Sequence, residues 1–169
     1  MYNEVFGVPG VGKTTFCNKS NNVVIKKINN IMNLKIKYCF KPLYKTKKLY
    51  SFISDYIPIT KKERIRFKRG MFVCLYHYYI TIDNNKQYIS DHGMIQTLSQ
   101  IKGLHNINDN DFWIKVFNIL PPINGTYINK NINDIMKQGK QRSTFDRTTN
   151  ELRSFQKFFN MMVLYLSTK

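Results

Sequence analysis

Residues 7–14, Gly-Val-Pro-Gly-Val-Gly-Lys-Thr, have the types and spacing of a phosphate-binding loop. They fit the pattern G-x-x-x-x-G-K-[ST] at every fixed position. Three glycines in this stretch let the backbone turn sharply and expose consecutive N–H groups, which can surround phosphates together with the start of a following helix. Lys13 would reach the β- and γ-phosphates of a nucleotide, Thr14 would offer its hydroxyl to Mg²⁺, and Thr15 could donate to the α-phosphate.

Such a loop needs a strand before it and a helix after it. Residues 1–6 are short and end in Val-Phe, so they can form a buried first strand, and residues 13–20 can open a helix. The alternative is a glycine-rich turn that matches the pattern by chance. The nucleotide-binding residues that the pattern predicts are Gly7, Gly10, Val11, Gly12, Lys13, Thr14 and Thr15.

Asp91 is the second candidate. It follows a short strand-like stretch, residues 87–90, and strands that alternate with helices imply a parallel sheet covered on both faces. Ligands of such sheets bind at the carboxyl ends of the strands. A carboxylate there can hold a Mg²⁺-bound water or accept a proton from a substrate hydroxyl, so Asp91 is predicted as a metal and catalytic residue. It could instead cap the helix expected over residues 94–101; the neighbouring His92 is expected to be structural or peripheral.

Two basic segments complete the candidate site. Residues 138–148 read as a lid, whose Arg142 and Arg147 would stabilise charge that develops during phosphoryl transfer and would help to exclude water. A helix over residues 61–80 has a basic first half, in which Arg66 and Arg69 could hold an anionic substrate. An ordinary solvated loop and an ordinary solvated helix end are the alternatives.

The remaining pattern predicts the elements that position these groups. Thr60 and Glu63 have the spacing of a capping box at the start of the helix over 61–80, whose second half is apolar enough to be buried. The alternating residues 34–40 predict a strand that Pro42 ends, and residues 23–25 could be a strand or continue a helix. Further helices are expected over 45–56, 94–101 (broken by Gly103), 111–119, 132–137 and 149–166, and a further strand over 125–129. The predicted fold class is α/β: a three-layer P-loop NTPase fold with a short parallel sheet flanked by helices, in a single domain over 1–169.

The composition indicates the class of partner and the cellular location to expect. The formal net charge is +17, which indicates either a general bias toward lysine or a surface that binds a polyanion. Three cysteines without close pairing argue against a disulfide framework, so we expect a reducing, cytoplasmic location. The apolar run 71–82 is interrupted by His77 and is too short to span a bilayer, so no membrane is expected.

In this order, the phosphate loop, the arginine-rich helix, the acidic strand end and the basic lid resemble the thymidylate-kinase-like group of P-loop kinases. Small kinase-like proteins of this kind carry an Asp-Glu-Gly triplet after the third strand, where this sequence has Asp91-His92-Gly93. Residues 64–70 fall where such kinases place substrate-contacting arginines, and residues 140–147 resemble their lid. Only the phosphate loop is specific by itself; the other features gain weight from their order.

The sequence departs from that group at three points. Position 92 is histidine instead of an acidic residue, and Gln138 stands where an arginine is usual. The resemblance also implies one more strand and helix beyond the last helix seen here, so we expect a truncated or divergent member. Exposed aromatic residues on that last helix would suit a homodimer.

Three functional hypotheses follow. The first is ATP-dependent and Mg²⁺-dependent phosphoryl transfer from a nucleoside triphosphate to a small-molecule acceptor, a nucleotide or nucleoside. The second is a nucleotide-binding regulator or nucleic-acid-associated P-loop NTPase, which would use the net charge of +17. The third is a remnant that binds nucleotide without turnover.

Overall fold

The computed structural model describes residues 2–19, 23–24, 36–83, 88–105, 107–139 and 147–168. In this part of the chain four parallel strands form one sheet in the order β2-β3-β1-β4. Their bounds are β1 Tyr2–Phe6, β2 Val23–Val24, β3 Tyr88–Ser90 and β4 Asn124–Tyr127. The central strand β1 pairs Glu4 with Ser90 on one side and with Gly125 on the other. The predicted α/β class, with a short parallel sheet flanked by helices, is confirmed.

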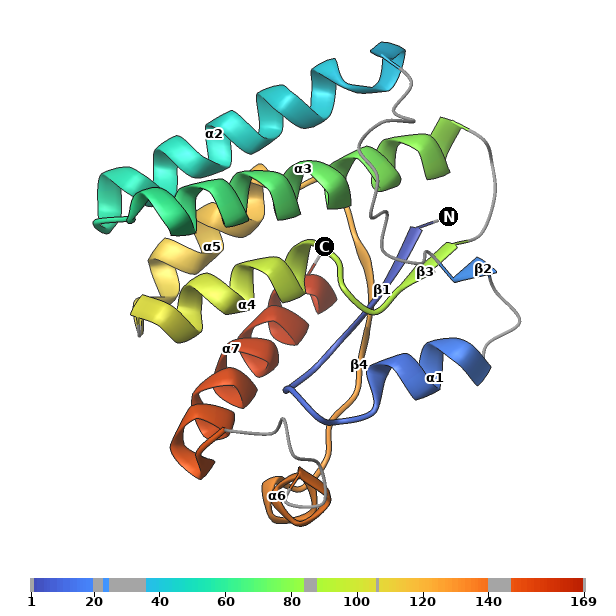
Figure 1. Ribbon diagram of the computed structural model, residues 1–169, viewed down its shortest axis with the longest axis vertical. Helices are drawn as coiled ribbons and strands as arrows, with labels where there is room; N and C mark the ends of the chain where they lie inside the picture. The colour runs from blue at the N-terminus through green and yellow to red at the C-terminus, as the bar shows by residue number, and fades with distance from the viewer. Residues whose placement is uncertain are drawn as a thin grey trace.

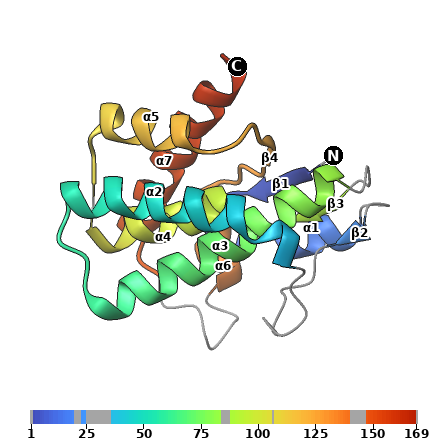
Figure 2. The ribbon, with the colours of Figure 1, turned by 90° about the horizontal axis from the view of Figure 1, so that it is seen from above.

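The helices lie on two sides of this sheet. Figure 1 shows α1 on one side of β1 and β4, with α2, α3, α4, α5 and α7 on the other, and Figure 2 shows the same arrangement from above. Their bounds are α1 Lys13–Lys19, α2 Phe40–Tyr56, α3 Lys61–Asp83, α4 Met94–His105, α5 Asn110–Ile119, α6 Ile132–Gly139 and α7 Thr149–Ser167, with a 3₁₀ turn, η2, at Ile36–Tyr38.

Alternation along β1 divides the core between the two faces of the sheet. Phe6 belongs to the larger cluster, which the helices α2 to α5 and α7 cover, and its ring stacks on Tyr127 of β4. Val5 points to the other face, where it packs with Cys17 of α1 and Ile89 of β3. Most of the apolar burial therefore lies on the face opposite α1.

Side chains cap the starts of three helices. The Thr60 N–H donates to the Glu63 carboxylate (2.8 Å) and the Glu63 N–H donates to the Thr60 hydroxyl (3.3 Å), which confirms the predicted capping box of α3. Thr148 and Glu151 form the same reciprocal pair at α7. Asp109 accepts the Phe112 N–H at 3.0 Å and caps α5.

The predicted strand over residues 34–40 is wrong where the structure describes it. Residues 36–38 form a 3₁₀ turn and α2 begins at Phe40; residues 34 and 35 lie outside the described residues. Pro42 stands in the first turn of α2, where its missing N–H costs no helical hydrogen bond. The alternation of apolar and polar residues suggested a strand, but from Phe40 onward the buried residues have helical spacing, at Pro42, Thr46, Leu49 and Ile53. The strand reading of residues 23–25 is right for Val23–Val24, and residue 25 lies outside the described residues.

One further expectation is corrected. Gly103 does not break α4, which runs on to His105; Phe155 of α7 fills the space beside Gly103, where an added Cβ would lie 2.6 Å from the ring. Phe155, Phe158 and Phe159 of α7 are buried in the core, and a homodimer through this helix stays a prediction. Within the described ranges, no helix has the length and apolar character needed to cross a bilayer.

Candidate functional site

The loop between β1 and α1 has the backbone that its glycines permit. Gly10 and Gly12 have φ angles of 86° and 97°, a region that residues with a Cβ rarely occupy. The Val11 N–H donates to the Val8 carbonyl (3.3 Å) to close a turn, and the Phe16 N–H donates to the Gly12 carbonyl (3.0 Å) to begin α1. Strand, loop and helix therefore follow one another as a phosphate loop requires.

The Lys13 side chain lies back along this loop. Its ammonium donates to the Gly7 carbonyl at 2.9 Å and to the Val8 carbonyl at 3.2 Å. Burial lowers the pKa of Lys13 from 10.5 to about 8, and the nearby Asp91 carboxylate opposes that change. A charged ligand with strong acceptor oxygens would offer this ammonium better partners than two neutral carbonyls.

Thr14 and Asp91 come together across the sheet edge. The Thr14 hydroxyl donates to Asp91 Oδ2 at 2.5 Å, although the two residues lie on α1 and in the turn after β3. Both follow strands that are neighbours and parallel, so both sit at the carboxyl edge of the sheet. Among the predicted site residues, this pair is joined directly, and Lys13 interacts electrostatically with the same carboxylate.

Hydrogen bonds to its backbone groups hold the turn that carries Asp91. The His92 N–H donates to the Ser90 hydroxyl (3.3 Å), and the His92 carbonyl accepts from the Cys74 thiol of α3 (3.4 Å). Thr97 of α4 donates to the Gly93 carbonyl at 2.9 Å. The His92 side chain itself is exposed. Contacts from three elements thus fix the path of residues 91–93.

Sequence reasoning missed Glu4, the most deeply placed charged residue near this turn. Its side chain is fully buried, on the large-core face of β1 between Tyr2 and Phe6. Glu4 Oε1 accepts the Gln96 N–H at 3.0 Å, and the N–H groups of Met94 and Ile95 also contribute hydrogen bonds. Burial outweighs these bonds and raises the pKa of Glu4 from 4.5 to about 8. The available signal was an acidic residue inside an otherwise buried strand, since such residues are rarely buried without a specific partner.

The predicted arginines Arg66 and Arg69 lie on α3, which packs against α4. Arg66 and Arg69 are exposed on the first half of α3. That half runs beside α4, because Gly70 faces Thr97 and Glu63 approaches His105 at 3.3 Å. Arg69 is therefore near the first turn of α4, and Arg66 lies closer to its far end.

The lid is described only at its last residues. Arg142 and residues 140–146 lie outside the described residues. Arg147 is exposed just before α7, forms an ion pair with Glu151 at 3.3 Å and lies 5.8 Å from the centre of the Phe155 ring. The predicted closing role of Arg142 and Arg147 therefore stays a prediction.

The donors available for a metal ion are oxygen atoms. Within the described ranges, His, Cys, Asp and Glu side chains form no group of three that could hold a metal ion by themselves. The Thr14 hydroxyl and the Asp91 carboxylate are hard oxygen ligands of the kind that Mg²⁺ prefers, and Mg²⁺ usually completes its shell with phosphates and water. This donor pair fits Mg²⁺ bound together with a nucleotide.

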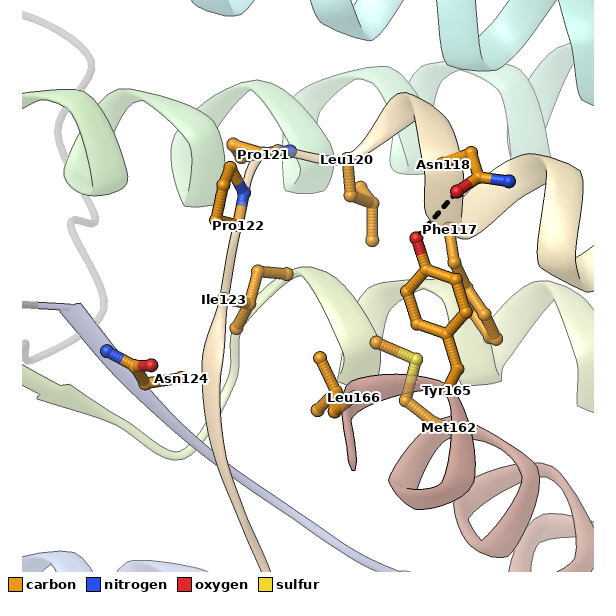
Figure 3. Close-up of a pocket in the computed structure, with 10 residues that line it drawn as sticks. All are labelled: Phe117, Asn118, Leu120, Pro121, Pro122, Ile123, Asn124, Met162, Tyr165 and Leu166. Carbon is orange, nitrogen blue, oxygen red and sulfur yellow. Dashed lines mark hydrogen bonds between the residues drawn. The ribbon is translucent and has the colours of Figure 1, made fainter. Parts of the chain in front are cut away.

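A pocket of about 390 Å³ lies elsewhere, between the end of α5, the start of β4 and the end of α7 (Figure 3). Its wall combines apolar side chains, among them Phe117, Ile123 and Met162, with polar ones, and Tyr165 donates to Asn118 at 2.8 Å. Because β4 is parallel to β1, the start of β4 lies at the opposite edge of the sheet from the phosphate loop. This pocket is therefore separate from the Thr14–Asp91 site.

The sequence matches no protein-family model and has no significant match among curated proteins. Among solved structures, the chain is similar to a deoxyadenosine kinase from M. mycoides with bound dATP. The TM-score is 0.45 and the identity 15%, over 97% of this chain and 86% of that chain. A likeness this distant assigns neither a ligand nor a residue role to the chain.

Proposed function

We propose that this protein is a P-loop kinase-like phosphotransferase that binds a nucleoside triphosphate with Mg²⁺ and phosphorylates a nucleotide or nucleoside, as thymidylate-kinase-like proteins do. The observation that carries the proposal is the Thr14–Asp91 hydrogen bond of 2.5 Å. It joins a complete phosphate-loop sequence to a carboxylate at the same edge of the sheet, and two such oxygen donors suit a nucleotide-bound magnesium ion.

In this proposal the loop residues bind the triphosphate and Lys13 moves its ammonium from the Gly7 and Val8 carbonyls to the phosphates. Thr14 and Asp91 would hold Mg²⁺, which when bound supplies positive charge that offsets the phosphate oxygens. Asp91 would also accept the proton of an acceptor hydroxyl. Arg69 and Arg66 would bind the acceptor, and Arg142 and Arg147 would close the site.

Isothermal titration with ATP and with GTP, each with Mg²⁺, tests the binding step. Lys13→Ala removes the one loop ammonium and is expected to abolish binding, whereas Lys19→Ala removes an exposed lysine from the last turn of α1 and serves as the matched control. Loss of binding in both variants would point to general electrostatics, and no binding by the wild type would refute the proposal.

Asp91→Asn then separates two kinds of acceptor. A hydroxyl acceptor needs a general base, and a phosphate acceptor does not, so the substitution should lower turnover about 10²–10⁴-fold further with nucleosides than with nucleotides. The measurement is a radiolabelled phosphate-transfer assay with both acceptor classes. Equal losses for both would show that Asp91 serves only the metal, and full activity on nucleosides would exclude it as the base.

A polyanion-binding surface is the second candidate, and one observation favours it. Exposed basic side chains follow one another along the adjoining helices α2 and α3, namely Lys41, Lys47, Lys48, Lys61, Lys62, Arg64, Arg66 and Arg69. Binding to DNA or RNA through this surface would weaken linearly on a log–log plot against salt. Binding that vanishes at physiological salt would remove this candidate.

A further inference from the structure

We propose that Glu4 is a positioning residue that holds the turn 91–93 and thereby keeps the Asp91 carboxylate directed toward Thr14. The proposal rests on the proposed function, since the role of Asp91 comes from there. Glu4 acts through the start of α4 and through Gly93.

The first step is the cap of α4. The opening N–H groups of a helix lack partners within the helix, and here the Glu4 carboxyl group of the neighbouring strand accepts the Gln96 N–H at 3.0 Å, with the N–H groups of Met94 and Ile95 contributing as well. Thr97 then donates to the Gly93 carbonyl at 2.9 Å. Because β1 pairs with a strand on each side, the cap ties the start of α4 to an inner strand of the sheet.

The second step is contact with the turn itself. A Cβ added at Gly93 would lie 2.3 Å from both Cδ and Oε2 of Glu4, so the carboxyl group lies directly against the backbone of residue 93. Glu4 Oε2 is buried and makes no hydrogen bond within the described residues. The Glu4 carboxyl group therefore contacts the turn directly as well as capping α4.

The third step is the span from Gly93 to Asp91. The intervening His92 is fixed by Ser90 on its N–H and by Cys74 on its carbonyl, at 3.3 and 3.4 Å. A displacement of Gly93 therefore cannot be absorbed at His92 and passes to Asp91. The hydrogen-bonded segment 91–93 thus links Glu4 to the Thr14–Asp91 hydrogen bond.

The test compares Glu4→Leu, which fills similar space but accepts no hydrogen bond, with Glu4→Gln, which keeps the acceptor. The matched control is Ser99→Ala, which removes a buried hydroxyl of α4 that bonds Gln96 within the helix and not the turn. ATP binding is titrated against free Mg²⁺ at a temperature at which all variants are folded. Glu4→Leu should raise the Mg²⁺ needed for half-maximal binding about tenfold, as one lost orienting interaction would do, with Glu4→Gln and Ser99→Ala within about twofold of wild type.

A second comparison shows whether the effect passes through Asp91. In an Asp91→Asn background, Glu4→Leu should change the Mg²⁺ requirement no further, because the group that it positions is gone. An unchanged Mg²⁺ requirement in Glu4→Leu, or an equal additional change in the Asp91→Asn background, would overturn the proposal.

Hydrogen exchange in the ligand-free protein tests the positioning role of Glu4 independently of nucleotide binding. Glu4→Leu should speed amide exchange of residues 91–97 in the ligand-free protein, and Glu4→Gln should not. If the wild type binds no nucleotide while this exchange pattern holds, the nucleotide proposal fails and the positioning of the turn stands. If exchange at 91–93 is unchanged in Glu4→Leu, the positioning role fails whatever the ligand.

Discussion

Replacing Glu4 by glutamine should change how stability depends on pH. A carboxyl group with pKa 4.5 in the unfolded chain and about 8 in the folded protein binds its proton more tightly when folded. Its contribution is therefore fully present below pH 4.5 and is lost as pH rises through about 8. The difference between those two pKa values corresponds to about 5 kcal/mol, a large share of the stability of an ordinary domain.

Glutamine has no proton to lose, so Glu4→Gln should gain up to that amount relative to wild type between pH 5 and pH 9, on top of a constant offset from altered hydrogen bonds. Urea unfolding followed by the fluorescence of Trp113 gives the measurement, since Trp113 is the sole tryptophan and is buried. Groups that titrate equally in both proteins cancel in the difference. If the two proteins lose or gain stability in parallel over this range, the buried, proton-binding state of Glu4 is refuted.

Two further pairs of substitutions test the packing and the cap of α7. Gly93→Ala should destabilise the protein by about 1–3 kcal/mol, because its Cβ would meet the Glu4 carboxyl at 2.3 Å, whereas Gly70→Ala meets only Thr97 at 3.4 Å and should be neutral or stabilising. Equal unfolding midpoints for these two variants would contradict that packing. Thr148→Ala should cost about 1 kcal/mol by removing the capping box of α7, and Thr149→Ala, one position later, should cost less; urea denaturation that ranks them the other way would exclude the cap.

Much of the fold was predictable because local chemistry and tertiary structure agree. The glycine loop requires a strand and a helix around it, and the capping box of Thr60 and Glu63 places the start of α3 at Lys61. The strand predicted over 34–40 failed because a short alternating pattern also fits an exposed 3₁₀ turn leading into a helix. Gly103 failed as a helix breaker because its role is set by a contact with Phe155, far away in the sequence.

The candidate site, too, was predictable from the sequence only in part. The meeting of Thr14 and Asp91 followed from a general rule, that parallel strands present their carboxyl ends at one edge. The role of Glu4 could not be predicted from the sequence. Its hydrogen-bond partner is the N–H of Gln96, some ninety residues later, and nothing near Glu4 in the sequence indicates that partner. Arg66 and Arg69 were chosen by residue type, and their placement depends on how α3 lies along α4.

The central place of β1 in the sheet also has a consequence for how the protein acquires its structure. The strand that leads into the phosphate loop pairs only with segments much later in the chain, Tyr2 with Tyr88 and Asn3 with Asn124. Closing such long intervals costs chain entropy before any pairing repays it, and this slows folding. A nascent chain that has emerged only as far as α3 would carry the whole loop sequence with neither neighbouring strand to hold it. The phosphate loop is thus translated early but becomes ordered late, so nucleotide binding would indicate that the sheet is complete.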